Sequence, residues 1–207
     1  GGTTDLLIDN NTIDGLGASD KAAISVNYTS GTGTATGNVT VSNNLIGQAG
    51  LLWTGGDGAA NAILLQALDG ASMTARIQYN EVTANTLLEV VRVRAAGTGT
   101  SVMNATVDGN TLVDTAGPQT AFGATAGNGG EYGTVNLNIA NNGMGSGGLS
   151  LNEIGFGTLN VTQADLGAVG ASNNAIPSAS GSPVFGQPVP PLPSTPFEYA
   201  EWKVAKV

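Results

Sequence analysis

One eight-residue phrase recurs five times along this chain of 207 residues: apolar, any, apolar, any, any, Asn, any, apolar. The five copies are Leu6-x-Ile8-x-x-Asn11-x-Ile13, Val39-x-Val41-x-x-Asn44-x-Ile46, Ala75-x-Ile77-x-x-Asn80-x-Val82, Ala105-x-Val107-x-x-Asn110-x-Leu112 and Leu137-x-Ile139-x-x-Asn142-x-Met144. Successive asparagines are 33, 36, 30 and 32 residues apart. A fixed phrase at a period of roughly 20–50 residues is typical of a solenoid.

The phrase predicts a strand, a bend and a second strand. Its first half places both apolar side chains on one face of a strand. The Asn falls where the chain must turn, and Asn adopts the left-handed conformation more readily than other residues that carry a side chain. In stacked coils the five asparagines would lie above one another, so we expect their amides to form a hydrogen-bonded ladder.

A sixth copy, Leu159-x-Val161-x-x-Ala164-x-Leu166, keeps the apolar frame but lacks the Asn. We therefore expect the ladder to end at Ala164. A third apolar segment separates successive phrases, at residues 22–28, 61–68, 87–95, 121–126 and 149–154. Each coil should thus hold three strands, with the uneven spacing absorbed by Gly-rich polar loops. The alternative is a β-sandwich of short strands, which has no reason to repeat one phrase in register.

These repeats resemble those of the right-handed parallel β-helix proteins of the pectin-lyase-like superfamily, of the bacterial surface or passenger type. The resemblance covers roughly residues 5–170 and rests on the Asn at the bend between two strands. It implies an all-β, right-handed parallel β-helix of about six coils, with Asn11, Asn44, Asn80, Asn110 and Asn142 as its ladder. The resemblance implies little about activity, because one fold supports many functions.

Composition excludes several classes of function. Six Lys and Arg against 15 Asp and Glu give a net charge of −9, which argues against nucleic-acid binding and against anionic membrane surfaces. With no His and no Cys, the chain has neither imidazole nor thiol chemistry. No apolar run reaches membrane-spanning length, so we expect no membrane insertion, and we expect no cofactor. We see no signal peptide, and the start on Gly1-Gly2 suggests a mature or excised segment of a larger parent polypeptide.

The repeat is lost after residue 175, where proline becomes frequent. We expect residues 1–175 to form the β-helix, 176–196 an extended Pro-rich linker, and 197–207 a strand-like aromatic segment. The apolar residues of that last segment include Phe197, Tyr199, Trp202 and Val204. This arm is expected to cap the last coil of its own column, to add to a neighbouring subunit, or to link to further chain.

Candidate catalytic groups are few. Arg92 and Arg94 alternate with valines, so they should point outward beside Ser25, Asn27, Gln66 and Asn152 on neighbouring coils. A uronate lyase also needs clustered carboxylates for Ca²⁺, and none accompanies these arginines. Asp69 and Glu89 are expected to form ordinary ion pairs with them.

A glycosidase needs two carboxylates about 5–9.5 Å apart. Asp9 with Asp14, and Asp108 with Asp114, flank two of the bends. These pairs lie on turns at different heights, as scattered surface acids also do, so we expect no catalytic residue.

We therefore expect a non-catalytic, extracellular or cell-surface β-solenoid with a structural or adhesive role. Expected partners are further copies stacked head to tail into a filament, or a larger parent polypeptide. The alternative is a module that binds or cleaves polysaccharide along the face that carries Arg92 and Arg94, with a glycan as its ligand.

Overall fold

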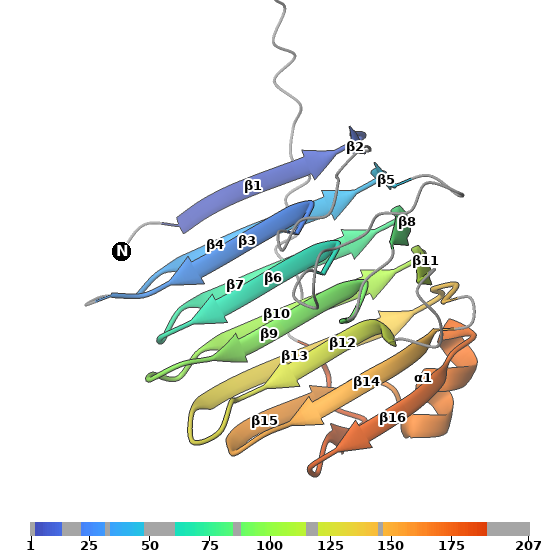
Figure 1. The fold of residues 1–207 in the computed structure, drawn as a ribbon. Coiled ribbons are helices and arrows are strands. Elements are labelled where there is room, and N and C mark those ends of the chain that lie inside the picture. The colour runs from blue at the N-terminus through green and yellow to red at the C-terminus, as the bar shows by residue number, and fades with distance from the viewer. Residues whose placement is uncertain are drawn as a thin grey trace, which may run out of the picture.

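The computed structural model describes residues 3–13, 22–31, 34–47, 61–84, 88–114, 120–144 and 147–189. Their strands stack into a column of coils, with the chain running from one end of the column to the other (Figure 1). Within the described ranges, every pairing between strands is parallel. The fold is a parallel β-helix, as the repeated phrase predicts.

Three sheets wrap the column. The first sheet has the order β1-β4-β7-β10-β13-β15-β17, the short sheet β11-β8-β5-β2, and the third sheet β16-β14-β12-β9-β6-β3. The strands of the first sheet are β1 Thr3–Asp9, β4 Thr36–Ser42, β7 Ser72–Gln78, β10 Val102–Asp108, β13 Tyr132–Ala140, β15 Phe156–Val161 and β17 Val184–Phe185. Those of the short sheet are β2 Thr12–Ile13, β5 Leu45–Ile46, β8 Glu81–Ala84 and β11 Thr111–Asp114. Those of the third sheet are β3 Ile24–Thr29, β6 Ile63–Leu68, β9 Val91–Ala96, β12 Thr120–Ala126, β14 Gly148–Glu153 and β16 Ile176–Ser180.

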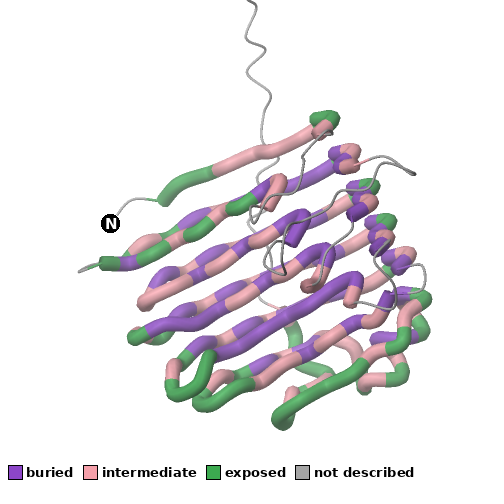
Figure 2. Tube along the Cα trace, in the orientation of Figure 1, coloured by how far each residue is buried: buried purple, intermediate pink, exposed green. Residues whose placement is uncertain are grey.

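Equivalent positions of the phrase stack on one another in the first sheet. The first apolar position aligns Leu6, Val39, Ala75, Ala105 and Leu137 across five strands. From Val39 onward these side chains are buried, and the residues between them are partly exposed. The interior is one continuous apolar stack, and exposure rises toward both ends of the column (Figure 2).

The sharp bend is made by the residue before each ladder asparagine. Asn10, Asn43, Tyr79, Gly109 and Asn141 have φ between 53° and 67°, in the left-handed region. We expected the ladder asparagine itself to be the left-handed residue, and that expectation is wrong. The left-handed residue reverses the chain, which leaves the following Asn free to point inward.

The sixth coil departs from the phrase. The sixth copy predicts that Leu159 lies opposite Leu137, but β15 pairs with Leu159 opposite Val135 and Val161 opposite Leu137. A helix, α1 (Leu166–Asn173), then stands where earlier coils have a strand of the short sheet. Ala164 is exposed and does not stack on the ladder.

The column also continues beyond the expected boundary at residue 175. β16 pairs with β14, and β17 pairs with β15, so residues 176–185 belong to the column and not to the expected linker. Pro177 is accommodated because β16 is an edge strand, where a missing N–H breaks no ladder bond. The expected aromatic segment, with Phe197, Tyr199, Trp202 and Val204, lies outside the described residues.

Candidate functional site

The asparagine ladder runs through the inside of the bends. Each Nδ2 donates to the Oδ1 of the next asparagine, at 2.9 Å for Asn11, Asn44 and Asn80, 2.8 Å for Asn110 and 2.7 Å for Asn142. The five expected members are confirmed. A sixth, Asn173, accepts the last of these bonds.

Each interior rung ties three coils together. In Asn80, for example, Nδ2 donates to the Val41 carbonyl of the preceding coil and to Asn110 Oδ1 of the following coil. Its Oδ1 accepts both the backbone N–H and the Nδ2 of Asn44. All rungs from Asn44 to Asn173 are buried. Buried amides are tolerated only when they are hydrogen-bonded, and here each one also fixes the stacking register.

Asn173 reaches the ladder from the last residue of α1. Asp165 caps the start of that helix, its carboxylate accepting the Ala168 N–H at 2.8 Å. Sequence analysis missed this element, although Asp165 before Leu166-Gly-Ala-Val169 is a recognisable N-cap signal. The ladder therefore continues beyond the place where Ala164 was expected to end it.

A second row of asparagines lies on the outer face of the first sheet. Asn136 Nδ2 donates to Asn104 Oδ1 at 2.7 Å, and Asn160 Nδ2 donates to Asn136 Oδ1 at 2.8 Å. On the first two coils, Asn38 donates to Asp5 in the same way at 2.7 Å. Sequence analysis missed this row. Its signal is an Asn directly before the first apolar residue of the phrase, and the same rule applied to Asn160 would have given the correct register of β15.

Arg92 and Arg94 project from the outer face of β9, as expected, but they are about three-quarters covered, with side-chain exposures of 25% and 23%. Arg92 lies 3.7 Å from a Glu89 carboxylate oxygen and donates to the Thr125 hydroxyl at 3.3 Å. Arg94 lies 3.9 Å from Glu131, which no sequence signal indicated. Burial, and then the charge of Arg92, lower the pKa of Arg94, while Glu131 opposes that shift.

The surroundings of the two arginines match the expected stacking in part. Gln66 and Thr125 flank Arg94 on the adjacent strands. Asp69 does not pair with either arginine. Its carboxylate instead accepts the N–H and hydroxyl of Thr98, at 3.0 and 3.3 Å. The Nε atoms of both arginines are buried, and no hydrogen-bond partner is found for them in the described part of the chain.

The acids at the bends are spread along the column. Asp9 and Asp108 lie three strands apart in the first sheet, about 14 Å at the usual strand spacing. Asp9 accepts bonds from Ser42 and Asn43, and Asp108 accepts one from Asn141. Asp114 is buried at the end of β11, and Asp14 lies outside the described residues. Among the residues that the structure describes, no three His, Cys, Asp or Glu side chains gather so as to hold a metal ion.

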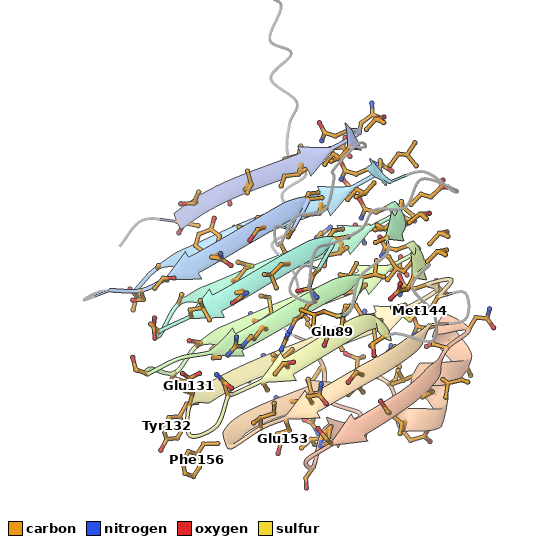
Figure 3. The ribbon with its side chains drawn as sticks, in the orientation of Figure 1. Glu89, Glu131, Tyr132, Met144, Glu153 and Phe156 are labelled. Atoms are coloured by element: carbon orange, nitrogen blue, oxygen red, sulfur yellow. The ribbon has the colours of Figure 1, made fainter. Side chains whose placement is uncertain are left out.

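An exposed aromatic pair stands at the corner between the third and first sheets. The rings of Tyr132 and Phe156 stack with centroids 5.1 Å apart, and both project away from the column (Figure 3). The two residues face each other at the starts of β13 and β15. Nothing in the repeated phrase predicts this pair, because both residues precede it.

Comparisons with known proteins add no identity. No protein-family model matches the chain, and neither a curated protein nor a solved structure was found to match it. Within the described ranges, no helix is long and apolar enough to cross a membrane.

Proposed function

We propose that this chain is a non-catalytic structural or adhesive β-solenoid that acts outside the cell or on its surface. The observation that carries this proposal is how its polar side chains are used. The inner ladder, the outer asparagine row and the carboxylates of Asp9 and Asp108 all make hydrogen bonds from one coil to the next. Groups committed in this way stabilise the stacking and are poorly placed to act on a substrate.

Composition supports the extracellular part of this proposal. Only 10% of the residues are charged, and the surface relies on neutral polar residues such as Asn, Thr and Ser. We also propose that the coils are those of the pectin-lyase-like superfamily in its right-handed form. The support for this relationship is the ladder asparagine, which occupies the same bend in five successive phrases.

A glycan array, together with an absorbance assay for unsaturated uronate products, tests the non-catalytic role. We expect no turnover and no specific glycan binding by the full chain. Turnover of any polysaccharide would overturn the proposal.

Self-association is the second part of the test. Light scattering over a concentration series, with negative-stain microscopy, would detect filaments built by head-to-tail stacking. The same series on a chain lacking residues 197–207 would show whether the aromatic segment contributes to assembly. Strict monomers with and without that segment would remove filament formation from the proposal.

The second candidate function is polysaccharide binding at Arg92 and Arg94. The observation in its favour is the pair of buried Nε atoms, which have no hydrogen-bond partner among the residues that the structure describes, since a carboxylate or hydroxyl of a sugar could accept bonds there. The test is the double substitution Arg92→Ala with Arg94→Ala, measured on any glycan that the array identifies. Arg76→Ala is the matched control, because Arg76 lies on β7 in the first sheet, away from this face. Loss of binding in the double variant alone would favour this candidate.

A further inference from the structure

The two ends of the asparagine ladder are chemically different. At the C-terminal end, Asn173 Nδ2 donates to Ile139 of the preceding coil, as the other rungs do. Its remaining donor capacity is satisfied within its own coil, by the Val169 carbonyl at 2.8 Å and the Ser172 hydroxyl at 3.0 Å. Helix α1 therefore closes this end of the ladder.

At the N-terminal end the ladder is open. Every later rung accepts two N–H groups on its Oδ1, one from the backbone and one from the side chain of the preceding asparagine. Asn11 is exposed, and no described residue donates to its Oδ1. Its Nδ2 bonds the Asp9 carbonyl of its own coil, whereas each later rung reaches a carbonyl of the coil before it.

The backbone of β1 repeats this pattern. Ser72, Val102 and Thr134 stand at the register position of Thr3, and each donates its N–H to the coil before it. Alternate residues donate to the same side of a parallel strand, so in β1 the N–H groups of Asp5 and Leu7 face the open end. β1 is the terminal strand of its sheet.

The apolar interior is also incompletely covered at this end. Leu6, Ile8 and Ile13 are only partly buried, whereas their counterparts Val39, Val41 and Ile46 on the next coil have at most 1% exposure. A coil placed on this end would bury apolar surface and supply the missing ladder donors in one step.

The C-terminal end of a second copy does not fit this requirement. The amide of its last rung, Asn173, already donates to Ile139 of the preceding coil and to Val169 and Ser172 of its own coil. Its terminal strands are the two-residue β17 and β16, where Pro177 lacks an N–H. Short edge strands and edge prolines are features that oppose strand addition.

We propose that the N-terminal end of the column is a docking surface for one more β-helical coil that carries an asparagine at the same bend and is continuous with Thr3. That coil, and not the end of a second copy, supplies the backbone N–H and the amide for Asn11 Oδ1. In parallel register the last residue of that coil leads directly into Thr3. Ser101 at the end of the third coil leads into Val102 at the start of the fourth in the same way. The inference deepens the proposed scaffold role and rests on it. At this end it puts a further coil in place of the head-to-tail contact between two columns, so the docked coil and the head-to-tail filament are alternatives that the oligomer measurement below separates.

The test adds such a coil to the full chain. Residues 72–101 make one complete coil, and Ser72 shares the register position of Thr3. A copy of residues 72–101 joined directly to Thr3 therefore places its asparagine, equivalent to Asn80, above Asn11. We expect the melting temperature to rise by about 5 °C. We also expect amide exchange at Asp5 and Leu7 to slow by about 100-fold, because these N–H groups gain partners.

The matched control carries Asn80→Ala in the added copy alone, and it should lose most of the gain in melting temperature. A second control, an extension of the same composition in scrambled order, should leave exchange at Asp5 and Leu7 unchanged. Unchanged exchange in the unscrambled extension would overturn the inference. So would concentration-dependent oligomers of the parent chain that protect the same two amides, because a second copy would then occupy this end. These readouts are independent of the glycan and lyase assays, so the docking surface and the scaffold role can fail separately.

Discussion

At the scale of single residues, the value of a ladder asparagine depends on its height in the column. Asn80 is buried, and its amide makes bonds to the coils on both sides. Asn80→Ala leaves the Asn44 N–H buried without its acceptor and removes the side-chain bonds to the Val41 carbonyl and to Asn110, which we expect to cost about 3 kcal/mol of unfolding free energy. Asn11→Ala removes an exposed amide and should cost under about 1 kcal/mol. Urea unfolding of both variants measures the difference, and equal losses would contradict this account.

A second prediction concerns the left-handed bend. Four of the five bends place Asn or Gly in this conformation, but the third uses Tyr79 at a φ of 56°. A bulky residue pays a steric penalty there, and the Tyr79 side chain is 60% exposed, so little buried surface offsets it. Tyr79→Asn should stabilise the protein by roughly 0.5–1 kcal/mol in a denaturant titration. Tyr79→Phe is the control and should change nothing, since it keeps the penalty. The Tyr79 ring lies over Gly109 of the next coil, so destabilisation by Asn would show that this contact contributes more to stability than the backbone penalty removes.

At the scale of elements, α1 replaces the strand that the repeated phrase forms in earlier coils, and its last residue, Asn173, still supplies a rung of the ladder. The Asp165 carboxylate that caps it is exposed, so its contribution is that of an ordinary N-cap. We expect Asp165→Ala to lower stability by about 1 kcal/mol and to loosen the last coil. Asp165→Asn should retain most of the cap. Hydrogen exchange would report this as faster exchange in α1 and β16 with the coils around Asn80 unchanged; loss of protection throughout would indicate that α1 supports the whole column.

The elements also show how far the sequence could predict this structure. The two strands of each phrase, the bend between them and the third apolar segment follow from local patterning, because the alternation of apolar residues and the turn residues act within a few positions. Asn173 lies 31 residues after Asn142, but it was missed because a helix, and not the repeated phrase, leads into it. The Glu131 partner of Arg94 comes from a turn 37 positions along the chain, and no local pattern records such a meeting. The prolines of 176–185 were read as a linker because edge position, which permits proline in a strand, is visible only in the assembled sheet.

At the scale of the whole molecule, each coil contacts only its neighbours, so stability is distributed along one dimension. Interior coils are bonded on both faces, and the first and last coils on one. The two end coils are nevertheless unequal, because α1 completes the hydrogen bonds of the last ladder rung while Asn11 leaves its acceptor open. Opening the column should therefore begin at its N-terminal end.

This asymmetry predicts an order of exchange along the chain. Amides in β1, β2 and β3 should exchange fastest, those in β14, α1 and β16 at an intermediate rate, and those in β7 and β10 most slowly. Opening of the first coil leaves the remaining five stacked as before. Asn11→Ala should therefore accelerate exchange in β1 and β2 alone. Asn110→Ala, placed in the middle, should accelerate exchange on both sides of the break. Peptide-resolved hydrogen exchange under native conditions measures all three sets. Uniform rates would mean that the column opens only as a whole, and faster exchange at the C-terminal end would show that α1 does not close the ladder.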